Sequence, residues 1–343
     1  MKKRIQYIDL ARGFCITLVV AYHINVALHL HQAQIFWETL TVFLLPLFFF
    51  LSGLLFKEYE NFLSFFLRKV NKLLIPFFFF YLVTSFAMPN ILNLFGVTVP
   101  DSSTLGISGL WAFIYEDFPN GPIWFLLAFF FANMYYYIIL VSVKHMISNQ
   151  NIVAAIVTII CFGIGFFSVT FISRNYNLYC FMDSALSALP FFAMGYLCFR
   201  YTEILVSNRF DKFLPIIVIA CFCFTFYVNG KCSYKSNTMY INPVLSYISG
   251  MTGTFGAIFF AKFLHDLPFV SYWGRYSLII LVSHSLLIKV YVPLLSKFGL
   301  PQPLLMAIML IVVMFSYQMI IPLMLKYLPY VTAQKDLINI KRE

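Results

Sequence analysis

Three ionisable side chains interrupt the first apolar segment of the chain. Asp9, Arg12 and His23 lie within residues 8–29, and an ionisable group inside a membrane-spanning helix costs about 2.5–3.5 kcal/mol on insertion scales. A buried cation suits an anionic ligand, and an imidazole suits proton transfer because its ordinary pKa lies near neutrality. These residues indicate a site that holds an anion and moves a proton. A second interpretation stays open, in which Asp9 and Arg12 anchor the helix at the interface and His23 hydrogen-bonds another helix.

The spacing of these residues places them close to one face of a helix. Arg12 and His23 are eleven positions apart, which at about 100° per residue is within about 20° of three full turns. A rise of 1.5 Å per residue separates them by roughly 16 Å along the axis. Asp9 lies three positions before Arg12, within reach of an ion pair. We expect Arg12 near the cytoplasmic end of this helix and His23 deeper in the membrane.

A second basic group precedes the third apolar segment. Arg68, Lys69 and Lys72 come directly before the run that starts at Leu73. Contact with lipid headgroups explains such a cluster, and so does binding of a nucleotide phosphate. Both interpretations stay open from these residues alone.

Two further segments carry candidate polar groups. His284 lies in the predicted span 275–295, nine positions after Arg275, so the two are expected on opposite faces of one helix. Ser52 and Gly53 form a small pair that permits close approach of another helix. No zinc-type spacing, paired cysteine ligands or phosphate-loop sequence occurs, so no metal site is predicted.

The longest connection between apolar segments, residues 97–122, is acidic and aromatic. It contains Glu116 and Asp117 beside Tyr115, and no Lys or Arg. Its aromatic stretch suits the membrane interface, whereas a lip that binds a polar acceptor would also use these groups. Connections of this length are usually functional or partly helical.

The composition decides which elements must position these groups. Of 343 residues, 62% are hydrophobic and only 10% are charged, against roughly 45–50% and about 25% in soluble domains. A soluble globule could not hide that apolar surface. We therefore predict an all-α, polytopic integral membrane bundle, a single domain over residues 1–343 with no appended soluble domain. Its ten predicted spans, each about 20 residues long, are 8–29, 36–56, 73–95, 123–143, 151–172, 184–200, 213–229, 240–263, 275–295 and 303–327.

The basic residues fall mainly on one side of these spans. With the N-terminus in the cytoplasm, 18 of the 23 Lys and Arg lie on the cytoplasmic side and five on the other, as the positive-inside rule describes. We therefore expect both termini in the cytoplasm and the chain in the cytoplasmic (inner) membrane. Because the net charge of +10 is scattered between apolar segments, it does not indicate a nucleic-acid partner. Cys180 and Cys232 fall in predicted loops, where a disulfide between them is left open.

Six short motifs occur in order along the chain. They are residues 7–13 with His23 separated from Arg12 by ten residues, 49–53 (Phe-Phe-Leu-Ser-Gly), 68–76 (Arg-Lys-Val-Asn-Lys-Leu-Leu-Ile-Pro), 121–126 with Trp124, 190–195 (Pro-Phe-Phe with a later Gly), and 274–278 with His284. Each motif alone is weak, but the ordered set resembles the membrane-bound acyltransferase-three family over nearly the whole chain. The Trp-Phe-Leu segment at Trp124 is similar to the fucose-4-O-acetylase-like branch.

The resemblance implies a bundle of about ten helices that transfers an acyl group, commonly acetyl from acetyl-CoA, to a sugar hydroxyl of an envelope glycan. It implies that His23 is the essential histidine and that Arg12 engages the acyl donor. Arg68, Lys69 and Lys72 would then hold the CoA phosphates. Acetyl-CoA is expected as a substrate rather than a tightly bound cofactor, and the expected partners are this donor, a surface or lipid-linked glycan and the bilayer. His23 is expected as a general base, with a transient acetyl-histidine as the alternative.

Two other functions compete with acyl transfer. A transporter or flippase for a glycolipid or polysaccharide precursor also needs ten spans and intramembrane charges, but we find neither an obvious internal repeat nor helices broken at matching positions. A membrane scaffold gives no reason for Arg12 and His23 to share a face. The sequence leaves the acceptor sugar, the acyl group and the oligomeric state open.

Overall fold

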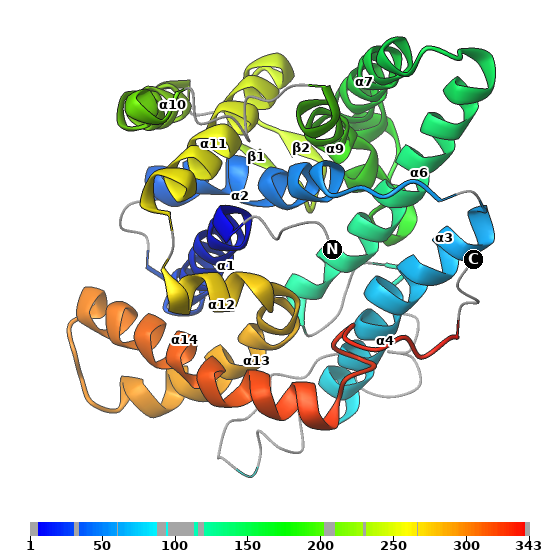
Figure 1. The fold of residues 1–343 in the computed structure, drawn as a ribbon. Helices are drawn as coiled ribbons and strands as arrows, with labels where there is room; N and C mark the ends of the chain where they lie inside the picture. Colours follow the sequence, from blue (N-terminus) through cyan, green and yellow to red (C-terminus); the bar gives the residue numbers. More distant parts are fainter. Residues whose placement is uncertain are drawn as a thin grey trace. The chain divides into compact units, whose positions relative to one another are not determined.

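The fold was analysed in a computed structural model, which describes residues 6–30, 34–59, 61–87, 94, 113–115, 120–201, 210–228, 231–265 and 267–339. Within these ranges the chain is helical apart from short connections and one small hairpin (Figure 1). Ten helical segments among the described residues are long and apolar enough to cross a membrane. The predicted all-α membrane bundle is confirmed.

The helices are, in chain order, α1 (Gln6–Ala27), α2 (Gln34–Leu54), α3 (Phe62–Lys69), η1 (Val70–Leu74), α4 (Ile75–Leu82), η2 (Val83–Ala87), η4 (Gly121–Ile123), α6 (Trp124–Met146), α7 (Gln150–Phe167), η5 (Ser168–Ile172), α8 (Ser173–Asn175), η6 (Tyr179–Phe181), α9 (Met182–Tyr201), η8 (Asp211–Phe213), α10 (Leu214–Val228), α11 (Pro243–Leu264), α12 (Pro268–Arg275), α13 (Ser277–Ser296) and α14 (Gln302–Tyr327). Two short strands, β1 (Cys232–Ser233) and β2 (Thr238–Met239), pair antiparallel between α10 and α11.

The third span begins eleven residues before the predicted start at residue 73. Its helix starts at Phe62, where the side chain of Asn61 accepts a hydrogen bond from the Leu63 amide and caps the first turn. It continues through α3, η1 and α4 to Ala87. The basic residues Arg68, Lys69 and Lys72 therefore lie within the helical run rather than before it, which corrects the prediction.

The ninth span begins two residues later than predicted, and this changes one geometric inference. Arg275 ends the short helix α12, and α13 begins only at Ser277. Arg275 and His284 therefore lie on different helices, and the prediction that they face opposite sides of one helix is wrong. The break at Tyr276, which has φ of −110° and ψ of 26°, is the physical reason.

The described chain forms two compact units. The first contains residues 1–15, 33–58 and 131–275, and the second contains residues 16–32, 59–130 and 276–343. Helices α1 and α6 each contribute to both units. The single domain predicted over residues 1–343 stays a prediction.

In the first unit, α2 packs against α9 and α11, α7 packs against α9, and α10 packs against α11 (Figure 1). Small residues make these approaches possible. Gly53 of α2 and Gly195 of α9 lie directly against the other helix's backbone, so the prediction of close packing at Ser52-Gly53 is confirmed. On α11, a Cβ at Gly250 would lie 3.0 Å from the Val42 carbonyl oxygen of α2, and a Cβ at Gly253 would lie 2.7 Å from the Phe43 side chain of α2.

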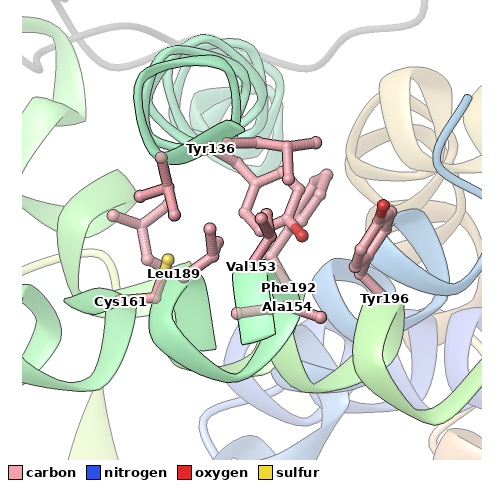
Figure 2. Close-up of a cluster of buried hydrophobic side chains, with 11 residues drawn as sticks. Tyr136, Val153, Ala154, Cys161, Leu189, Phe192 and Tyr196 are labelled. Carbon is pink, nitrogen blue, oxygen red and sulfur yellow. The ribbon is translucent and has the colours of Figure 1, made fainter. Parts of the chain in front are cut away.

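A buried aromatic cluster fills the first unit between α6, α7 and α9 (Figure 2). The rings of Tyr136 and Phe192 are 4.6 Å apart between centroids, and Tyr196 lies beside them. The hydroxyl of Tyr196 donates a hydrogen bond to Glu58, which also forms an ion pair with Lys144. The cluster thus ties the end of α2 to α6 and α9.

The hairpin between α10 and α11 folds into the first unit. Asn237 in its turn donates a hydrogen bond to the Ser168 hydroxyl, with the heavy atoms 3.0 Å apart. Burial raises the pKa of the Cys232 thiol to about 12, so this thiol is protonated and unreactive near pH 7. Cys180 and Cys232 are both free thiols, so the disulfide left open from the sequence does not form here.

In the second unit, α13 packs against α14, α4 and η4. The seam between α13 and α14 is polar in part, because the Ser283 hydroxyl is 2.9 Å from the Tyr317 hydroxyl and Tyr291 is 2.9 Å from Ser316. Such pairs satisfy polar groups that would otherwise be stranded in an apolar setting. This unit also holds His23 and His284.

Candidate active site

His23 lies on α1 next to a second histidine. The centroids of the His23 and His284 rings are 5.0 Å apart with the planes tilted by 50°, and Tyr22 meets His23 edge-on at 5.3 Å. His23 is half-buried, whereas His284 on α13 is fully buried. The sequence predicted both residues as candidates but not their contact. A half-buried imidazole beside an enclosed one is an arrangement that can exchange a proton with a bound hydroxyl.

Arg12 and Asp9 lie on the same helix as His23, as predicted. α1 is continuous from Gln6 to Ala27, so the eleven-residue spacing of Arg12 and His23 is a helical spacing. Asp9 is buried and Arg12 is half-buried. Beside them, α12 approaches so closely that a Cβ on Gly274 would lie 1.8 Å from the Asp9 carbonyl oxygen. The packing of α12 therefore fixes the turn of α1 that carries both charges.

The basic cluster on α3 and η1 contacts rings and a C-terminal segment. The Arg68 guanidinium lies 5.2 Å from the centre of the Tyr59 ring, and the Lys69 ammonium lies 5.3 Å from that of Phe65. Such cation–π contacts hold a cation over an apolar surface. Lys72 differs from its neighbours, since it forms an ion pair of 3.0 Å with Asp336 and donates to the Ala333 carbonyl at 2.7 Å.

Asn71 holds the same C-terminal segment, and sequence reasoning did not select it. Its Oδ1 accepts hydrogen bonds from the amides of Leu337 and Ile338, at 3.0 and 2.9 Å, and its Nδ2 donates to the Ile338 carbonyl at 2.9 Å. Asn71 is fully buried in η1, a π-helical turn of the kind often found at functional sites. The only sequence signal was a polar residue between two cations of a recognised motif.

Asn120 is a second buried amide that the sequence analysis missed. It is fully buried and donates to the Val282 carbonyl of α13 at 2.9 Å. It joins the start of η4, and hence of α6, to the middle of α13. Trp124, a predicted candidate, is the first residue of α6 and is also buried.

The remaining predicted candidates are spread over the chain. Ser52 is half-buried in α2, and Arg275 is exposed at the end of α12. Glu116 and Asp117 lie outside the described residues. The structure thus brings His23 together with His284, and Lys72 together with the C-terminal segment. Among the described residues, no group of three or more His, Cys, Asp or Glu is placed to hold a metal ion.

Comparison with known families decides the class of protein. The model of the acyltransferase 3 family, which describes an acyltransferase domain, matches residues 5–323, nearly the whole chain. The chain belongs to the acyltransferase 3 family. This acyltransferase is therefore a multi-pass membrane enzyme that moves an acyl group from a donor to an acceptor. Searches among curated proteins and among solved structures gave no match.

The family membership gives the geometry a chemical meaning. Acyl transfer to a hydroxyl needs a base for the hydroxyl proton and a place for the donor. In this acyltransferase, His23 and His284 are the imidazoles found in contact, and Arg12, Arg68, Lys69 and Lys72 are the cations that the motifs single out. The matched residues 5–323 include all six of these positions.

Proposed function

We propose that this enzyme transfers an acetyl group from acetyl-CoA to a hydroxyl of a cell-envelope carbohydrate in the cytoplasmic (inner) membrane, with His23 as the general base. The observation that carries the proposal is the position of His23. It lies half-buried in a membrane-spanning helix, against the enclosed ring of His284. An imidazole kept from bulk water by its neighbours can take a proton from a bound hydroxyl without competition from solvent.

His23 alone can take up and return the one proton that the reaction moves. His23 takes the proton of the acceptor hydroxyl while its oxygen attacks the thioester carbonyl. The new carbon–oxygen bond forms, the carbon–sulfur bond breaks, and the proton passes from His23 to the departing thiolate. The alternative is an acetyl-histidine on His23, from which the acetyl group then moves to the acceptor.

The donor is proposed to bind along the cationic residues. Arg12 precedes His23 by roughly 16 Å along the helix, a length comparable with the extended pantetheine arm of CoA. The phosphates of CoA would then lie near Arg68, Lys69 and Lys72, which belong to the same unit as His23, while the thioester approaches His23. Arg12 keeps the donor-engaging role that the family resemblance implies. The acidic and aromatic residues 97–122, with Glu116 and Asp117, are proposed to meet the carbohydrate.

The proposed class is tested on cells with and without the gene. Mass spectrometry of surface glycans should show the loss of one acetyl unit from a specific sugar when the gene is deleted. Purified enzyme with acetyl-CoA and that glycan should restore the modification. Unchanged acetylation together with altered glycan export would contradict acyl transfer to the glycan and favour a transporter.

The ion pair of Lys72 gives a test of the donor site. If Lys72 binds a CoA phosphate, Asp336 competes for the same ammonium group. An ion pair between partly exposed groups contributes up to about 1 kcal/mol, so we expect Asp336→Asn to lower the KM for acetyl-CoA by up to about fivefold. Lys72→Gln should raise that KM, with kcat little changed in both variants.

A matched control for these variants is Lys335→Gln. Lys335 is the neighbour of Asp336 and its side chain is exposed, so this variant changes the local charge without touching Lys72. It should leave the KM for acetyl-CoA as it is. An unchanged or raised KM in Asp336→Asn would contradict competition for Lys72.

A further inference from the structure

His284 has a fixed proton and an unused lone pair. Its Nδ1 lies 2.9 Å from the Ile280 carbonyl oxygen. Because a carbonyl can only accept, Nδ1 carries the proton of the neutral ring and Nε2 is an acceptor. Nε2 is buried and has no hydrogen-bond partner among the described residues. A buried acceptor without a donor is costly, and such a group calls for an explanation.

The packing of α13 and α14 holds this orientation. The Ile280 carbonyl that receives the His284 proton also lies 3.5 Å from the hydroxyl of Tyr317. Tyr317 is fully buried and is itself paired with Ser283 at 2.9 Å. Turning the His284 ring would leave Nδ1 without its carbonyl in an apolar interior, so Nε2 stays the acceptor.

The neighbouring ring that can supply a donor is His23. Hydrogen-bonded heavy atoms lie about 3 Å apart and each ring nitrogen lies roughly 1 Å from its ring centre, so centroids about 5 Å apart suit an imidazole pair. The observed separation is 5.0 Å. Because Nε2 of His284 has no hydrogen-bond partner in the part of the chain that the structure describes, although the His23 ring is adjacent, a rotation of the His23 ring would be what brings an N–H toward Nε2. Catalytic hydrogen bonds commonly tighten in this way only when substrate is bound.

We propose that His284 is a positioning residue for His23, accepting a hydrogen bond at Nε2 from one ring N–H of His23. The other ring nitrogen of His23 is then the lone-pair base that faces the acceptor hydroxyl. When that nitrogen takes the hydroxyl proton, the N–H toward His284 stabilises the imidazolium, and the same proton leaves to the thiolate. His284 gains and loses no proton. The inference rests on the proposed role of His23 as general base.

Two substitutions test the two ring nitrogens of His284 separately. His284→Asn keeps a donor near the Nδ1 position, for the Ile280 carbonyl, and removes the acceptor. His284→Gln places an acceptor oxygen near the Nε2 position and gives up the Nδ1 bond. We expect His284→Asn to lower kcat by about 10- to 100-fold, by analogy with the loss seen when the hydrogen-bond partners that orient metal-binding histidines are replaced. The KM for acetyl-CoA should stay unchanged, and His284→Gln should recover part of the lost kcat.

The matched control is His265→Asn. The Nδ1 of His265 also contacts a backbone carbonyl, that of Phe263 at 2.7 Å, but the residue is exposed at the end of α11. This variant should keep the wild-type kcat. Each variant is compared as monodisperse protein from size exclusion, with its thermal midpoint measured beside the rate.

The outcomes distinguish a failure of the positioning role of His284 from a failure of the proposed acetyl transfer. Full kcat in His284→Asn, or a kcat in His284→Gln no higher than in His284→Asn, would overturn the positioning role while wild-type turnover still supports the general base. If one of the two variants does not fold, the kcat of the other one decides. His284→Asn must then have a kcat well below that of wild type, or His284→Gln must have a kcat above that of a third variant, His284→Ala. A wild-type enzyme that transfers no acetyl group contradicts the proposed function itself.

Discussion

Replacing His23 with alanine is expected to lower the rate of acetyl transfer by about 100- to 10,000-fold, the contribution usually made by a general base. Without the imidazole, the acceptor hydroxyl has no group to take its proton as it attacks the thioester. His284 does not replace it, because its ring is fully buried on α13 and lies behind the place of the His23 ring, with the centroids 5.0 Å apart. The KM for acetyl-CoA should change little, since the proposed phosphate contacts lie elsewhere.

The measurement is single-turnover acetyl transfer by purified enzyme, with loss of the thioester and gain of the acetylated glycan followed together. His29→Asn is the control, because His29 follows α1, is exposed and has a φ of 53°, a conformation that asparagine tolerates. It should transfer acetyl at the wild-type rate. Product formed by His23→Ala at the wild-type rate would remove His23 from the reaction.

Incubation with acetyl-CoA alone separates the two routes through His23. Direct transfer leaves the enzyme unmodified until an acceptor is added. A mass increase of one acetyl group on the peptide that contains His23 would instead establish the covalent route. Both routes require His23, so this experiment decides the mechanism and leaves the general expectation for His23→Ala in place.

The sequence was sufficient for those parts of the site that lie within one helix. Arg12 and His23 are related by helical periodicity alone, and α1 runs unbroken through both. The ten spans likewise follow from the length of their apolar runs. Gly53, predicted to permit close approach of another helix, does lie against α9, because small residues let helix backbones approach closely in a membrane bundle.

The parts that the sequence did not predict depend on contacts between distant segments. His284 reaches His23 from a helix more than two hundred positions later, and Asn71 holds the backbone of Ile338. No local pattern encodes either contact. The start of the third span was misplaced because Arg68 and Lys69 suggested a segment outside the membrane. In the structure both residues belong to the helix α3, and their long side chains lie over aromatic rings.

Substituting Gly53 of α2 with alanine is expected to cost more stability than an ordinary overpacked core position. A Cβ at Gly53 would lie 1.8 Å from the carbonyl oxygen of Phe192, and a Cβ at Gly195 would lie 1.9 Å from that of Phe50. The contact is thus reciprocal, with each glycine set against the other helix's backbone. Overpacking a core usually costs about 1–3 kcal/mol because side chains shift to relieve it. A backbone carbonyl within a helix has no such freedom, so α2 and α9 must separate, and we expect a cost above that range.

Gly163→Ala provides the matched control in the same unit. Gly163 lies in α7 and is exposed, with no atom within 4 Å of the position a Cβ would take. Alanine there removes the helix penalty of glycine, worth about 1 kcal/mol, so its thermal midpoint in detergent should equal or exceed that of wild type. Gly53→Ala and Gly195→Ala should both unfold at clearly lower temperature and give less monodisperse protein. If Gly53→Ala were as stable as Gly163→Ala, the two backbones could not be in direct contact. The Phe-Phe-Leu-Ser-Gly motif would then need an explanation other than the packing of α2 on α9.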